Sequence, residues 1–77
     1  MNAGSYIRNT RIHLGLTQAR LGKMAGCSQS DISKYERGTR PSRLEVISRL
    51  ASALQITREE VIFGPLPQQR GGSVDVP

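Results

Sequence analysis

The chain has 77 residues and a net charge of +5, with one cysteine and one histidine. These counts allow a single small domain, and they exclude an intramolecular disulfide and a structural zinc site. No apolar run approaches the roughly 20 residues that a membrane-spanning helix needs, and the N-terminus lacks the apolar segment of a secretory signal. A cytoplasmic protein with no membrane partner is therefore expected.

The positive charge is concentrated in the first part of the chain. Residues 1–43 carry eight basic and two acidic side chains, a net charge of +6, whereas residues 44–77 carry three basic and four acidic ones, a net charge of −1. A basic face on a near-neutral body is typical of proteins that bind a polyanion. The alternative is a basic surface that is simply solvated.

The sequence patterns predict an all-α fold of five helices, because no stretch alternates between apolar and polar residues as a strand would. The first helix is expected over roughly residues 4–14, and one face of it carries Ile7, Arg11 and Leu14. Thr17 is the expected N-cap of a second helix over roughly 18–25. Gly26 ends that helix, since glycine accepts a positive φ.

A third helix is expected to begin only a few residues later, over roughly 29–37. The letters SQSD predict a capping box, in which Ser28 accepts from the amide of Asp31 and Asp31 reaches back. Ile32 and Tyr35 are expected to point inward.

The fourth helix, roughly 43–54, is expected to follow the loop GTRPS. The letters SRLE predict a second capping box, at Ser42 and Glu45. The predicted apolar stripe of this helix consists of Leu44, Ile47, Leu50, Ala51 and Leu54.

The fifth helix is short, and a third capping box at Thr57 and Glu60 opens it. Its apolar end is the consecutive run Val61, Ile62 and Phe63. A domain of residues 1–64 is expected, followed by a proline- and glycine-rich arm, 65–77, that is flexible or extended.

The close succession of the second and third helices predicts a tight corner at Gly26. Its spacing is that of a helix-turn-helix, in which the second helix of the pair enters the major groove of DNA. The alternative at this level is an ordinary corner between two helices of an all-helical core.

The stretch GLTQARLGKMAGCSQSDISKYERGTRPS resembles the phage-repressor-like helix-turn-helix family, the Cro, lambda-repressor and XRE proteins. The shared pattern is G-L-T-Q, a glycine at the turn, and I-S-x-aromatic-E-x-G before a loop with proline. The resemblance extends over residues 7–64 and implies a compact five-helix DNA-binding domain. Gly22 stands where the family usually has alanine, and Cys27 where it has an aliphatic residue.

The third helix is then the expected recognition helix. Its exposed N-terminal side chains would face the bases, and they are Gln29, Ser30, Ser33 and Lys34. Glutamine suits adenine, lysine suits guanine, and serine permits a close approach. The alternative is a solvated helix face.

The phosphate contacts are expected around that helix. The resemblance implies that Gln18 grips a phosphate and braces Gln29. The other candidates are Ser28, Tyr35, Arg37, Arg40 and Arg43. We expect Arg8, Arg20 and Lys23 only to add to the positive field.

The resemblance also implies an ion pair between Arg11 and Glu36 that orients the recognition helix. The alternative is two separate, solvated charges. His13 is expected to be solvated, and Cys27 to be a small core residue. We find no catalytic constellation, metal site or cofactor motif in the sequence, so an enzyme is not expected.

A lone recognition helix covers few base pairs, and members of the family overcome this by pairing. We therefore expect a homodimer on a palindromic operator in double-stranded DNA, with Ile62 and Phe63 in the interface. The alternative for these two side chains is a cover formed by the arm with Leu66. The expected function is a transcriptional regulator, most simply a repressor. The alternative is an antitoxin that neutralises a toxin partner and regulates its own operon.

Overall fold

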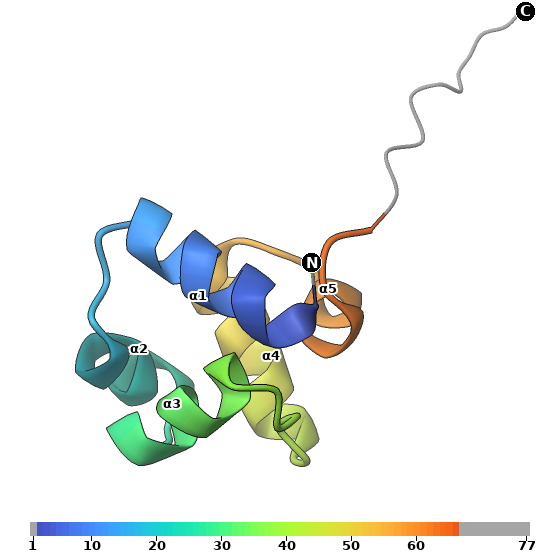
Figure 1. The fold of residues 1–77 in the computed structure, drawn as a ribbon. Helices are drawn as coiled ribbons and strands as arrows, with labels where there is room; N and C mark the ends of the chain where they lie inside the picture. Colours follow the sequence, from blue (N-terminus) through green and yellow to red (C-terminus); the bar gives the residue numbers. More distant parts are fainter. Residues whose placement is uncertain (1, 67–77) are drawn as a thin grey trace, which may run out of the picture.

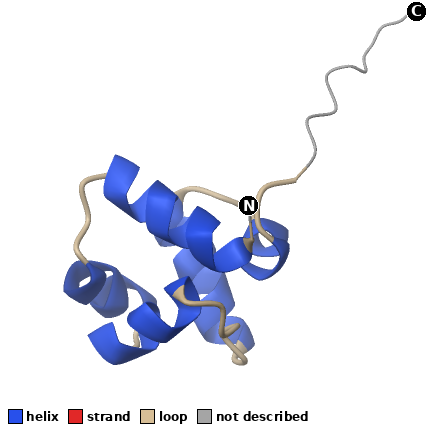
Figure 2. Ribbon diagram, viewed as in Figure 1, coloured by secondary structure: helices blue, strands red, loops and turns tan. Residues whose placement is uncertain are grey.

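The computed structural model describes residues 2–66 and folds them into five α-helices (Figure 1). They are α1 (Ala3–His13), α2 (Gln18–Ala25), α3 (Gln29–Glu36), α4 (Leu44–Leu54) and α5 (Arg58–Phe63). Figure 2 shows short loops between these helices and no strand in this part of the chain. The predicted all-α fold is confirmed. The expected arm, 65–77, lies outside the described residues from residue 67 onward.

Local hydrogen bonds set the starts of four helices. The side-chain oxygen of Asn2 accepts from the amide of Ser5 at 2.8 Å and caps α1. The hydroxyl of Thr17 accepts from the amide of Arg20 at 3.0 Å. The capping box at Ser28 and Asp31 is present, and so is the one at Thr57 and Glu60. Each of these bonds joins residues three apart, so each follows from a few neighbouring letters.

The predicted capping box at Ser42 and Glu45 is wrong. The N-cap of α4 is Arg43, in an extended conformation, and no side chain caps this helix. Glu45 is therefore the second residue of α4 instead of the third, too early to reach back to the N-cap amide. It forms an exposed ion pair with Arg49 one turn later, at 2.7 Å.

The core lies around α4, which contacts α1, α2 and α5. Its buried side chains are Ile7, Leu21, Ala25, Ile32, Val46, Ile47, Leu50, Ala51, Leu54 and Val61. The predicted stripe of α4 is correct except at its start, because Leu44 is 66% exposed and Val46 is buried in its place. Leu44 is the first residue of α4 and lies beyond the end of the core. Leu14 is likewise exposed, because α1 ends at His13.

Two glycines let helices approach closely. The Cβ of an alanine at position 22 would lie 2.7 Å from the backbone oxygen of Cys27, so Gly22 allows α2 to pack against the start of α3. At position 4 the Cβ would lie 2.7 Å from the backbone oxygens of both Tyr35 and Glu36, so Gly4 seats α1 on the end of α3. Gly26 then turns the chain between α2 and α3 with φ 74°.

Candidate nucleic-acid interface

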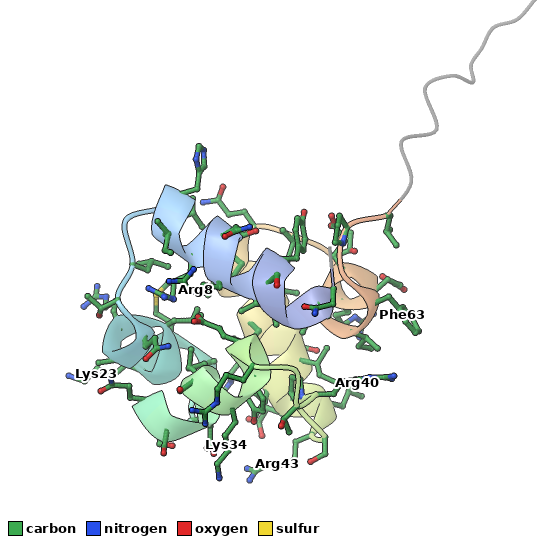
Figure 3. The ribbon with its side chains drawn as sticks, in the orientation of Figure 1. Arg8, Lys23, Lys34, Arg40, Arg43 and Phe63 are labelled. Atoms are coloured by element: carbon green, nitrogen blue, oxygen red, sulfur yellow. The ribbon has the colours of Figure 1, made fainter. Side chains whose placement is uncertain are left out.

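The predicted base-reading side chains share the free surface of α3. Gln29, Ser30 and Lys34 are exposed, whereas Ser33 is half-buried. On the opposite face of the helix, Ile32 is fully buried, and Tyr35 packs partly against the core. Figure 3 shows Lys34 extending away from the body of the molecule. The structure therefore brings three of the four predicted side chains to solvent on one short helix.

Basic side chains flank this helix on its C-terminal side. Arg37, Arg40 and Arg43 are all exposed. Figure 3 shows Arg43 and Lys34 extending from the same edge of the molecule, with Arg40 farther along it. Arg8 lies on α1, away from that edge. These positions fit a row of cations beside the exposed face of α3.

The remaining phosphate candidates already have structural contacts. The Ser28 hydroxyl accepts the amide hydrogen of Asp31 at 3.0 Å as the cap of α3. Tyr35 is half-buried, and burial, with the nearby Cys27 and Asp31, raises the pKa of its hydroxyl, while Arg43 lowers it. Arg43 is thus close enough to α3 for its charge to act on a side chain of that helix.

A polar network joins three helices behind the recognition face. Arg11 Nε donates to Glu36 Oε2 at 2.6 Å, and Arg11 Nη2 donates to Glu36 Oε1 at 3.2 Å. Only 11% of the Arg11 side chain and 3% of the Glu36 side chain are exposed. Arg11 Nη1 also donates to the carbonyl oxygen of Leu16 at 2.8 Å. The pairing that the family resemblance implied is therefore a bidentate, nearly buried ion pair.

Gln18 belongs to the same network. Its Nε2 donates to Glu36 Oε1 at 3.0 Å, which ties the start of α2 to the end of α3. Within residues 2–66, Gln18 makes no hydrogen bond with Gln29, contrary to the expected brace. The Gln18 amide bonds instead to Glu36, at the other end of α3 from Gln29.

A long-range contact that no sequence pattern predicts holds α5. The Tyr6 hydroxyl donates to Glu60 Oε2 at 2.7 Å, across 54 positions of sequence. Hydrogen bonds from Thr57 and Tyr6 hold the pKa of Glu60 below its ordinary value, and the bond to Glu60 raises the pKa of Tyr6. No sequence pattern links these two residues, because they are 54 positions apart. The capping box of α5 already gives Glu60 a local role.

The cysteine and the histidine play no part in this surface. Cys27 is half-buried against the core, and burial raises the pKa of its thiol, which favours the neutral form. His13 is exposed at the end of α1, as expected. Among residues 2–66 there is no group of three metal-ligating side chains, and no helix there is long and apolar enough to cross a bilayer.

Comparison with known proteins identifies the fold. A family model described as Helix-turn-helix matches residues 7–61. Repressor protein C2 of Salmonella phage P22 is 38% identical over 65 residues, which are 84% of this chain and 30% of that protein. This chain belongs to the phage-repressor-like helix-turn-helix family. Residues 7–61 accordingly form the helix-turn-helix DNA-binding domain of that family.

Two solved helix-turn-helix structures show the same arrangement. The P22 c2 repressor in complex with a synthetic operator has a TM-score of 0.77 and 35% identity, over 84% of this chain and 98% of that one. The restriction-modification controller protein C.AhdI from Aeromonas hydrophila has a TM-score of 0.67 and 35% identity, over 78% and 91%. The chain spans less than a third of the length of the P22 repressor protein.

Proposed function

We propose that this regulator binds a palindromic operator as a homodimer, with α3 of each copy in the major groove, and represses transcription there. The observation that carries the proposal is the exposed face of α3, with Gln29 and Lys34 on it and Arg43 beside it. Amide and ammonium groups on a short helix suit the edges of adenine and guanine. The structural similarity to a repressor that was crystallised with a synthetic operator supports the same mode of docking.

The exposure and position of each side chain suggest whether it reads bases or binds a phosphate. Gln29, Ser30 and Lys34 read bases from the N-terminal and central part of α3, and Ser33 lines the edge of that face. Phosphate contacts come from Arg37, Arg40 and Arg43, with Ser28 and Tyr35 as lesser contributors. The Nε2 of Gln18 already donates to Glu36, so Gln18 contacts a phosphate only through its remaining polar hydrogens.

The surface for the second copy lies at the end of α5. Of the three consecutive apolar residues, Val61 is buried, Ile62 is half-buried and Phe63 is 66% exposed. Leu66 is itself 45% exposed. Pairing through Phe63 would allow two α3 helices to meet successive major grooves about 34 Å apart. Such a regulator works in the cytoplasm, on the DNA that carries its operator.

The test is selection of bound sequences from a random duplex pool. The expected product is an inverted repeat, and binding to it should weaken steeply with salt. If a dimer neutralises about eight phosphates, the slope of log K against log salt is about −7. Failure to enrich any sequence, or an affinity that does not change with salt, would overturn the proposal.

A further inference from the structure

A basic edge beside α3 runs from Lys23 past Lys34 and Arg43 to Arg40 (Figure 3). The two ends of this basic edge have different surroundings. At one end, Arg40 borders a groove of about 300 Å³ that is also lined by Ile62 and Phe63. At the other end is Lys23, on α2. Figure 3 shows Lys23 and Arg40 on opposite sides of the molecule, with Lys34 and Arg43 between them. Only the Arg40 end adjoins the exposed apolar surface of α5.

Helix geometry places Lys23 on the flank of α2 next to α3. Successive residues of an α-helix are about 100° apart. Gly22 is the residue through which α2 touches the backbone of Cys27 at the start of α3. Lys23 lies about 100° around the helix from Gly22, whereas Arg20 lies about 160° from Gly22, on the side of α2 opposite that contact. Lys23 and Arg20 are both exposed on α2, and Lys23 is the one that lies nearer to a ligand bound at α3.

Lys23 is also available for a new contact. Its side chain is exposed, and within residues 2–66 it forms no ion pair with an acidic side chain. An ammonium on a flexible four-carbon stem suits a phosphate that needs no fixed bidentate geometry.

We infer that Lys23 holds a backbone phosphate at the outer end of each half-site, beyond the base pairs that α3 reads. The inference rests on the proposed dimer, because pairing through Phe63 turns the Arg40 end of the edge toward the two-fold axis. Lys23 then faces outward, toward the DNA that flanks the operator. Arg40 serves a phosphate on the inner side, near the centre of the operator.

The experiment compares two duplexes that contain the same selected operator. One has long flanking sequences, and the other is trimmed to the base pairs that α3 reads. Affinities are measured for the wild type, for Lys23→Gln, and for Arg20→Gln as a control with the same loss of charge on the same helix. Trimming should weaken the wild type and Arg20→Gln about 3- to 5-fold, the effect of one exposed charge contact. Lys23→Gln should show that loss already on the long duplex and lose nothing more on trimming.

Salt dependence gives a second readout. On the long duplex, each Lys23→Gln substitution should reduce the magnitude of the salt slope by about 1 per protomer. Equal thermal melting of the variants and the wild type shows that both fold. The inference is overturned if trimming weakens Lys23→Gln as much as the wild type, or if the sensitivity to trimming disappears in Arg40→Gln instead. A protein that selects no operator, or stays monomeric on it, overturns the proposed function itself.

Discussion

Arg11 on α1 and Glu36 at the end of α3 form an ion pair whose Nε–Oε2 distance is 2.6 Å, with both side chains nearly buried. The two charges have lost most of their water, so each depends on the other for compensation. The pair adjoins the carbonyl of Leu16 and the amide of Gln18, and so it links three helices at the back of the recognition face.

Removing one partner of this pair should therefore be costly. Arg11→Ala should lower the free energy of unfolding by about 3–5 kcal/mol, because Glu36 is left buried and unpaired. Arg49→Ala is the matched control, since its ion pair with Glu45 is exposed and worth at most about 0.5 kcal/mol. Urea denaturation measures both.

The double variant tests whether the two side chains act together. Arg11→Ala combined with Glu36→Ala should be less destabilised than the sum of the single variants. Additive losses would show that the pair does not interact energetically.

Gly22→Ala tests close packing between α2 and α3, because propensity and packing predict opposite signs. Alanine favours a helix interior over glycine by about 1 kcal/mol. The added Cβ would, however, meet the oxygen of Cys27 at 2.7 Å, and backbone cannot move away cheaply. We expect a net loss of about 1–3 kcal/mol in thermal or urea denaturation. A more stable variant would show that α2 and α3 separate easily.

The Tyr6–Glu60 bond should make stability depend on pH at the acid end. The pKa of Glu60 is lowered in the folded protein, first by the amide of Thr57 and then by the Tyr6 hydroxyl. Its contribution to stability is therefore fully present above the ordinary pKa of 4.5 and is lost as pH falls through the lowered value. Tyr6→Phe should thus differ most from the wild type near neutral pH, and the difference should shrink below about pH 4.

Tyr35→Phe is the control for that series, since Tyr35 forms no hydrogen bond with a carboxylate among residues 2–66.

At the alkaline end the dependence of stability on pH has the opposite sign. The pKa of Tyr6 is raised, so its contribution is fully present below its ordinary pKa of 10.0 and is lost as pH rises through the higher folded value. A Tyr6→Phe difference that is constant from pH 3 to neutrality would contradict the assignment.

Base reading and phosphate binding should separate by mutation. Lys34→Ala should cost about 1–3 kcal/mol on the selected operator and relax its preference at one or two positions. Arg43→Ala should weaken binding to all sequences alike and make the salt slope shallower. Repeating the random-pool selection with each variant measures both effects. An altered preferred sequence for Arg43→Ala would reverse these roles.

Pairing should depend on Phe63, which exposes 66% of its surface at the end of α5. Sedimentation at micromolar concentration, with and without operator, measures the oligomeric state. The wild type should be dimeric on DNA, and Phe63→Ala should bind as a monomer with lower affinity. Leu44→Ala is a suitable control, because Leu44 is equally exposed but lies at the start of α4. Unchanged pairing by Phe63→Ala would place the interface elsewhere.

Local chemistry made much of this fold predictable. Thr17, Ser28 and Thr57 begin helices by bonding amides three residues ahead, and Gly26 accepts the positive φ between α2 and α3. The exposed face of α3 follows from the same short-range rules, since Ile32 fixes which side is buried. The capping box predicted at Ser42 failed at a helix whose start no side-chain hydrogen bond defines, and the same late start leaves Leu44 exposed.

By itself, the sequence determined the five helices, the tight corner and the basic character of one face, because these depend on residues a few positions apart. Only the tertiary structure decided that Gly4 seats α1 on α3, that Gln18 bonds to Glu36 and that Tyr6 reaches Glu60. It also decided that Val61 is buried while Phe63 stays exposed. These relationships join distant parts of the chain, or depend on which face of a helix its neighbours cover. Their geometry is set by how whole helices pack.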